Sequence, residues 1–228
     1  GANATLGTPL LYFLLFIFYM LSSIIVVFFN VALISCAKMR LEEHDPTLKD
    51  GFKAAFSHIG KIISLSLLNA TIGLLIRIIA DKLEEKSPFI ASLVSGILGA
   101  AWSILTFFVI PVMIFENKGL FASIKESGSL IKHSWGERLG AGITLGLGFA
   151  MLFVIAAIPL VLGIFVFHST MAIIIGAIIS VLLWIVLGTL SSALNGIFVA
   201  SLYHYIKTGT AVGYSSDEMK KVFVAKTK

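Results

Sequence analysis

Long apolar runs alternate with short charged connections along the chain. No Asp, Glu, Lys or Arg occurs in residues 1–37, 87–115 or 139–206. Each run exceeds the roughly 20 apolar residues that a helix needs to cross a bilayer core. Because lipid cannot satisfy free peptide groups and the runs lack the alternating pattern of barrel strands, they predict transmembrane helices. The expected fold class is an all-α polytopic transmembrane helix bundle.

Five spans are expected from these runs. The last one covers 37 residues and would extend roughly 55 Å as a helix, against a hydrocarbon core of about 30 Å. It must therefore tilt, break near residues 188–192, or project into water, and we favour projection of its C-terminal end. The expected spans are residues 9–37, 60–81, 88–114, 140–165 and 170–206.

The distribution of basic residues predicts how the chain is threaded. Fourteen of the 17 Lys and Arg residues fall in connections on one side, and only Arg77, Lys82 and Lys86 fall on the other. The positive-inside rule then places the C-terminus in the cytoplasm and the visible N-terminus outside, in what we expect to be a prokaryotic inner membrane. A further helix upstream of this chain would make that topology easier to insert.

Two cytoplasmic connections carry the same device, a short basic amphipathic helix. In the first, Leu48, Phe52, Ala55, Phe56 and Ile59 share one face, and Lys49, Asp50, Lys53 and Ser57 share the other. In the second, Leu120, Ile124, Ile131 and Trp135 form the apolar face, and Lys125, Ser129, Lys132 and His133 the polar face.

The arrangement span, amphipathic helix, span thus occurs twice in one orientation. We expect a single membrane-embedded domain over residues 1–228, with repeats at about 9–81 and 88–165, a final helix at 170–206 and a tail at 207–228. Both short helices fit a place on the membrane surface, where Lys49, Lys53, Lys125 and Lys132 would contact lipid headgroups. Packing of these helices on protein is the alternative.

Six short stretches of sequence resemble an uncharacterised prokaryotic family of multi-pass membrane proteins, a domain-of-unknown-function family. The order and spacing of these stretches carry the resemblance, which extends over nearly the whole chain and implies no activity. More distantly, the arrangement is similar to YciC-type proteins and to the membrane domain attached to some glycerophosphodiesterases. The stretches are residues 28–33, 45–51, 69–73, 111–117, 135–137 and 200–205.

The residues that carry chemistry are scattered. The five His residues have no ligand spacing, the single Cys36 has no partner for a disulfide, and the nucleotide-binding and hydrolase motifs are missing. We therefore expect no metal, no cofactor, no nucleic-acid partner and no enzymatic activity.

Polar residues within the spans are candidates for a pathway. Asn30, Asn69 and Asn195 lie in three different spans, where an amide either lines a polar path or bonds to a neighbouring helix. Arg77 lies near the outer end of its span with Asp81 one turn later, which favours snorkelling or a local ion pair over a role in an ion relay.

Small residues at a spacing of four predict close helix packing, within one chain or between chains. Gly142 and Gly146 form one such pair, and Gly96 and Ala100 form another. Pro111 and Pro159 are expected to kink their spans.

Three functions follow from these patterns. The one we favour is a non-enzymatic membrane scaffold or envelope component, with lipids, a membrane protein or a second copy of the chain as partner. The alternative is a transporter or channel for ions or small solutes, in which the three asparagines converge. An enzyme acting on lipids ranks last, because no acid, base or metal cluster is present in the sequence.

Overall fold

The computed structural model describes residues 2–134, 140–167 and 169–209, and their side chains over 9–132, 148–166 and 169–209. Helices make up nearly all of these ranges, and no strand occurs in them. Five helical stretches there are long and apolar enough to cross a membrane. They confirm the all-α transmembrane fold class and the five expected spans. The stretches are Pro9–Leu41, Ile59–Glu84, Pro88–Phe115, Gly148–Val166 and Thr170–Thr208.

The chain divides into two compact units, Gly1–His133 and Ser134–Lys228. The boundary falls inside the second expected repeat, directly after the second amphipathic helix. Each unit is described separately below.

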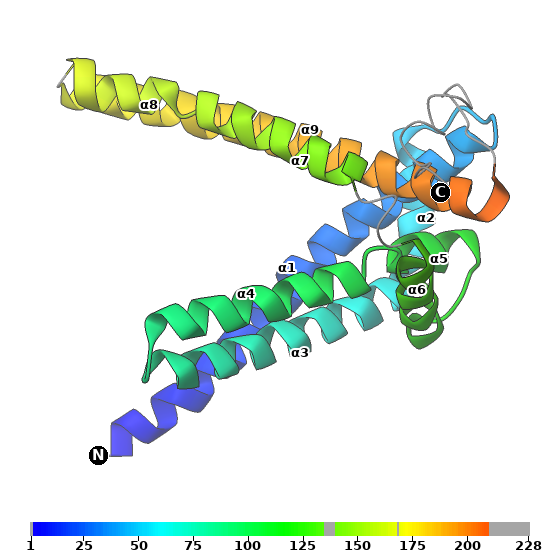
Figure 1. The fold of residues 1–228 in the computed structure, drawn as a ribbon, viewed down its shortest axis with the longest axis horizontal. Helices are drawn as coiled ribbons and strands as arrows, with labels where there is room; N and C mark the ends of the chain where they lie inside the picture. The colour runs from blue at the N-terminus through cyan, green and yellow to red at the C-terminus, as the bar shows by residue number, and fades with distance from the viewer. Residues whose placement is uncertain (1, 135–139, 168, 210–228) are drawn as a thin grey trace, which may run out of the picture. The chain divides into compact units, whose positions relative to one another are not determined.

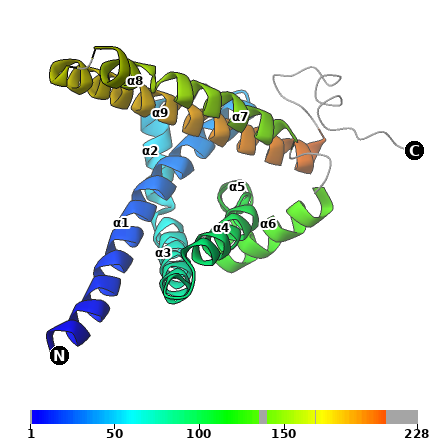
Figure 2. The same cartoon turned by 60° about the vertical axis from the view of Figure 1, so that its left-hand side comes forward.

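The first unit is built on α1, α3 and α4, of which α3 and α4 lie side by side in an antiparallel hairpin (Figures 1 and 2). Its core gathers apolar side chains near one end of the bundle, and the most deeply buried are Val31, Ile62, Leu65, Val109, Val112 and Met113. Its helices are α1 (Ala2–Leu41), α2 (Leu48–Ser57), α3 (Ile59–Glu84), α4 (Pro88–Leu105), α5 (Val109–Phe115) and α6 (Leu120–Ser134).

The third span of this unit is broken between α4 and α5. Pro111 has no N–H and its ring crowds the carbonyl four residues earlier, so the helix is interrupted over residues 106–108. Ser127 of α6 satisfies the freed backbone: its Oγ donates to the Leu105 carbonyl at 2.7 Å and accepts from the Phe108 N–H at 3.1 Å. The proline therefore creates a gap that α6 fills.

The second unit packs a second broken span against one long helix, and both views show α7 and α8 alongside α9 (Figures 1 and 2). Pro159 follows a similar break, and the Leu160 N–H donates to Ser180 Oγ of α9 at 3.2 Å. A Cβ on Gly176 would lie 2.4 Å from the Pro159 carbonyl oxygen, so glycine is needed for this approach. The second unit consists of α7 (Gly140–Ile155), α8 (Ile158–Leu162), the π-helix η1 (Gly163–Phe167) and α9 (Thr170–Thr208).

The last helix is continuous over its 39 residues, a length of roughly 58 Å. The break considered near residues 188–192 is therefore wrong. Those residues stay helical because Gly, Thr and Ser each cost at most about 1 kcal/mol relative to Ala in a helix, which packing can offset. The helix ends at Gly209, whose φ of 70° is the left-handed conformation that glycine adopts at helix C-termini.

Candidate functional site

The most elaborate polar arrangement lies at the end of the first unit where α1 and α5 end and α3 begins. Lys38 Nζ donates to the Ile114 carbonyl at 3.5 Å and lies 5.5 Å from the centre of the Phe115 ring. Lys61 Nζ donates to the Met113 carbonyl at 3.2 Å. Two cations thus meet the carbonyl end of α5, where the helix dipole favours positive charge.

A second bond fixes the chain just after α5. Lys61 Nζ also donates to Asn117 Oδ1 at 2.6 Å, and Asn117 has a positive φ of 52°. Asparagine tolerates that conformation better than most residues because its short polar side chain bonds locally. These bonds join the end of α1 and the start of α3 to the end of α5, and we call Lys38 and Lys61 the platform lysines.

The amphipathic helix α2 begins at a capping box. Thr47 Oγ1 accepts from the Asp50 N–H at 3.4 Å, and the Thr47 N–H donates to Asp50 Oδ2 at 2.9 Å. The Thr47 hydroxyl and N–H lower the pKa of the Asp50 carboxyl, because both bonds favour its charged form. Helix α2 thus begins at Leu48, two residues after Pro46.

Helix α2 then folds back along α1. Its contacts move from Cys36 to Ala32 to Phe28 as α2 runs from Thr47 to Phe56, so the two helices are antiparallel. Gly51 is buried there, and a Cβ on it would lie 2.7 Å from Cys36 Sγ and 3.3 Å from the Ala32 carbonyl oxygen.

The bulky face of α2 points away from this contact. Leu48 is 83% exposed and Phe56 is 64% exposed. Phe28, Phe29, Phe52 and Phe56, which we call the aromatic patch, have neighbouring ring centres 5.0 to 6.1 Å apart. Lys49 and Lys53 are exposed beside it.

The expected apolar face of α2 therefore divides into two. Ala55, which was expected to share a face with the aromatic residues, is buried with Gly51 against α1, while Leu48, Phe52 and Phe56 stay outside. The small residues permit the close contact, and the large ones remain available to the surroundings.

The second amphipathic helix, α6, is held differently. Ser123 and Ser127 are buried on its inner face with Ile131, and Leu120 and Ile124 are half-buried. Lys125 and Lys132 are exposed as expected, while Trp135 lies outside the described residues. The inner face is thus more polar than the expected one.

Ion pairs mark the entry into α6. Lys118 Nζ lies 2.5 Å from Glu116 and 3.4 Å from Glu126. The hydrogen bond to Glu116 and the charge of both carboxylates raise the pKa of Lys118.

The polar residues within the spans have separate surroundings. Asn69 Nδ2 donates to Ser23 Oγ at 3.1 Å, and Asn69 Oδ1 accepts from Trp102 Nε1 at 3.1 Å, so its amide joins α1, α3 and α4. Asn30 is half-buried on α1, and Asn195 is exposed on α9 in the second unit.

At the other end of the first unit, Arg77 takes part in a small cluster. Its Nε lies 2.9 Å from Asp81 Oδ1, and the Tyr12 hydroxyl donates to Asp81 Oδ2 at 3.1 Å. The local pair expected for Arg77 is present, and Tyr12 extends it from α3 to α1.

The expected small-residue pairs differ from the observed points of close approach. Gly96 has nothing within 4 Å of a Cβ built on it, and Ala100 is exposed. Gly142 and Gly146 lie in α7, where the side-chain surroundings are outside the described part of the chain. Close approach occurs instead at Gly51, Gly163 and Gly176. Gly51 has Ala55 four residues later and Gly176 has Ser180, so these two contacts keep the small-residue spacing at positions other than the expected ones.

Within the described ranges, no three His, Cys, Asp or Glu residues group closely enough to hold a metal ion. What the geometry does combine is a bundle of apolar spans, a platform of lysines on a helix end, and an exposed aromatic and basic helix beside it.

These features define a polytopic α-helical membrane protein. A family model described as a family of unknown function (DUF6159) matches residues 10–213, and the chain belongs to that family. No curated protein and no solved structure matches the chain, and the more distant likeness to YciC-type proteins and glycerophosphodiesterase membrane domains has no support in these comparisons.

Proposed function

We propose that this protein is a non-enzymatic membrane scaffold component whose α2 and α6 contact lipid headgroups at the cytoplasmic face. The observation that carries the proposal is the outer surface of α2, where Leu48, Phe52 and Phe56 are exposed beside Lys49 and Lys53. Bulky apolar side chains next to lysines are the surface that an interfacial helix presents to a bilayer.

The attachment of α2 to α1 supports this placement. Phe28 and Phe29 belong to a span, so the aromatic patch continues from the lipid-facing side of α1 onto α2. Large apolar surface on a membrane protein is stable where lipid covers it, and lysine side chains extend from that depth to the headgroups. Each lysine near an anionic surface adds about 1 kcal/mol of attraction.

Helix α6 offers a second, smaller surface of the same kind. Phe121 is 79% exposed at its first turn, and Lys125 and Lys132 are exposed further along. Since the platform lysines hold the ends of α1, α3 and α5 together, both helices are presented from one end of the unit.

The test compares the wild type with a variant in which four lysine charges are removed together. Wild type and the Lys49→Gln/Lys53→Gln/Lys125→Gln/Lys132→Gln variant are reconstituted in vesicles of phosphatidylcholine with or without phosphatidylglycerol, and retained phosphatidylglycerol is counted after extraction. We expect the wild type to retain more of the anionic lipid than the variant does. Equal retention would rule out headgroup contact by these lysines.

Solute flux through the wild type and an Asn69→Leu variant distinguishes the scaffold from the transporter. Asn69 uses both ends of its amide in bonds to Ser23 and Trp102, which accounts for its place in a span by helix packing. Solute flux through reconstituted wild type that is altered by Asn69→Leu, without loss of folding, would favour the transporter over the scaffold.

A further inference from the structure

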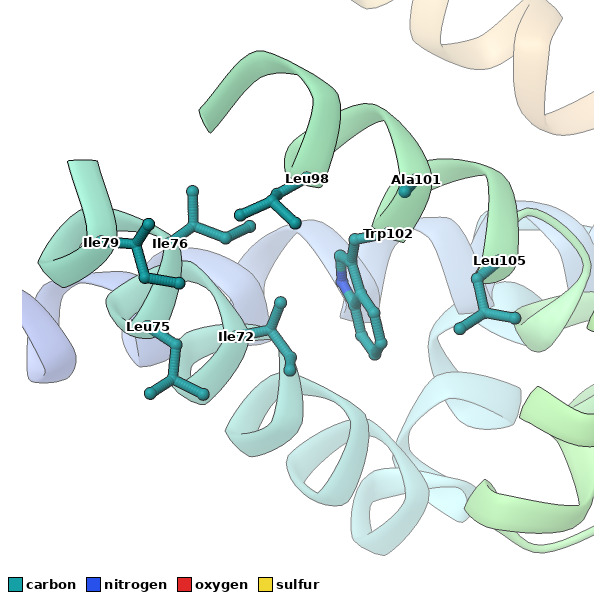
Figure 3. Close-up of a pocket in the computed structure, with 8 residues that line it drawn as sticks. All are labelled: Ile72, Leu75, Ile76, Ile79, Leu98, Ala101, Trp102 and Leu105. Carbon is teal, nitrogen blue, oxygen red and sulfur yellow. The ribbon is translucent and has the colours of Figure 1, made fainter. Parts of the chain in front are cut away.

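An apolar groove lies between α3 and α4, and its lining residue Leu105 also contacts α6. It has a volume of about 310 Å³, close to the lower limit for small-molecule sites. Figure 3 shows the indole of Trp102 between the two helices and Leu98 facing Ile76 and Ile79. The full lining is Ile72, Leu75, Ile76, Ile79, Leu98, Ala101, Trp102 and Leu105.

The inner wall of the groove is held in place by hydrogen bonds. Trp102 Nε1 donates to Asn69 Oδ1, and Asn69 Nδ2 donates to Ser23 on α1. The indole is therefore oriented by its only polar atom, and its ring presents an apolar surface to the groove. Because these bonds are made within the unit, the groove does not depend on an occupant for its shape.

The groove face of α3 continues into two lysines. Lys82, in the last turn of α3, follows Leu75 by seven residues and Ile79 by three, intervals that bring side chains to the same side of a helix. Lys86 lies two residues beyond the end of α3, and both lysines are exposed. Within the described part of the chain, neither ammonium has an ion pair.

The acidic residues of this end lie elsewhere on the helix. Asp81 is bonded to Arg77 and Tyr12 on the side that faces α1. Glu84 and Glu85 follow Asp81 by three and four residues, so they share that side. The mouth of the groove is consequently basic while the opposite side of the same turn is acidic.

We propose that the groove binds one acyl chain of an anionic phospholipid, with the phosphate of that lipid at Lys82 and Lys86. From Ile79 to Ile72 the groove covers about 10 Å along α3, which fits within one leaflet of about 15 Å. The lining makes contact with hydrocarbon only, and the two lysines sit where the headgroup of such a lipid would begin. This site requires that the helices span a membrane but makes no use of the lysines of α2 or α6.

The groove contains a natural reporter, Trp102, which suits quenching by brominated lipids. A Trp135→Phe/Trp184→Phe variant keeps Trp102 as the one tryptophan of the three in the sequence. It is placed in phosphatidylcholine vesicles that contain equal small fractions of either brominated phosphatidylglycerol or brominated phosphatidylcholine. We expect the anionic lipid to quench Trp102 several-fold more strongly, and Lys82→Gln and Lys86→Gln each to weaken that preference about fivefold.

Two further variants test the groove itself. Ala101→Phe places a ring in the groove and should remove the excess quenching, whereas Ala100→Phe, one position away on the same helix, should not. Since Trp184 Nε1 donates to the Phe153 carbonyl, replacing Trp184 affects the second unit. Native mass spectrometry of the chain with all tryptophans therefore repeats the comparison, and it should detect retained phosphatidylglycerol in wild type and Ala100→Phe but not in Ala101→Phe.

Other results would overturn the proposal. Equal quenching by the two brominated lipids would mean that only the general lipid surroundings reach Trp102. If neither lipid quenches and a Cys36→Ala/Leu75→Cys chain forms a disulfide-linked dimer, a second copy occupies the groove. Neither outcome would alter the expected effect of Lys49 and Lys53, so failure here is distinguishable from failure of the proposed function.

Discussion

Helices α2 and α6 each follow a span but are attached to the spans in different ways. Helix α2 contacts α1 through packing, with Gly51 and Ala55 buried and no strong hydrogen bond between the two helices' side chains among the described residues. Helix α6 is bonded to the backbone of a broken span through Ser127.

The difference indicates which of the two helices can contact lipid with its large side chains. A helix that completes the hydrogen bonds of a span cannot move without exposing buried polar groups, which is costly in lipid. Helix α2 packs on α1 through Gly51 and Ala55, and its large apolar side chains remain exposed. We therefore expect α2 to contribute more to lipid contact than α6 does.

The largest effect is expected at Gly51. A Gly51→Leu change must push α2 away from Cys36 and the Ala32 carbonyl, with a loss of about 3 kcal/mol in the free energy of unfolding in detergent micelles. Gly60→Leu is the matched control, because nothing lies within 4 Å of a Cβ at that position.

A second change sharpens the Gly51 prediction. Cys36→Ala removes the sulfur that a Cβ at position 51 would meet, so Gly51→Ala should destabilise the protein less in a Cys36→Ala background than in the wild type. Equal losses in both backgrounds would place the constraint elsewhere.

A smaller loss is expected at Ser127. Ser127→Ala leaves the Phe108 N–H and the Leu105 carbonyl without their partner, at a cost of about 2 kcal/mol in unfolding free energy. Lys125→Ala, at an exposed position on the same helix, should change stability little. A neutral Ser127→Ala would contradict the hydrogen-bonded attachment of α6.

The cap of α2 should respond to pH. The pKa of Asp50 is lower in the folded state than the unfolded value of about 3.9, so its contribution is complete above that value and is lost as the pH falls through the folded pKa. Hydrogen exchange at the Asp50 and Gly51 amides should accelerate in wild type relative to Asp50→Asn as the pH is lowered through that window. A constant ratio of the two rates would exclude the carboxylate cap.

The smallest effect on stability, within about 0.5 kcal/mol, is expected from removing exposed lysine charges. Lys49→Gln/Lys53→Gln should nevertheless reduce retention of phosphatidylglycerol more than Lys125→Gln/Lys132→Gln does. The reverse order would assign lipid contact to α6 and invalidate the comparison.

Much of the fold was predictable because lipid imposes one rule on every span. The five spans and the presence of the two short helices α2 and α6 follow from uncharged runs and from 3.6-residue periodicity. The continuity of α9 was not predictable, because a run of small and polar residues such as 188–192 is compatible with either a break or a helix. Local sequence does not distinguish a break from a continuous helix where tertiary packing supplies the stabilising free energy.

The details of the site were less accessible. The exposure of Lys49 and Lys53 could be predicted, because both lie on the polar face of α2. The importance of Gly51 could not, because it depends on how closely α1 passes. The role of Ser127 depends on a break caused by Pro111, 16 residues earlier in the sequence and on another helix. Contacts of this kind depend on the three-dimensional path of the chain.

The most direct test of the central claim, that α2 lies at the membrane interface, is a spin-label depth profile in vesicles. Labels are placed singly at positions 48, 49, 52 and 53 in a Cys36→Ala background, and their accessibility to oxygen and to a water-soluble nickel complex is compared. The account predicts that labels at 48 and 52 meet oxygen and those at 49 and 53 meet nickel. Four labels equally accessible to nickel would place α2 in water and contradict it.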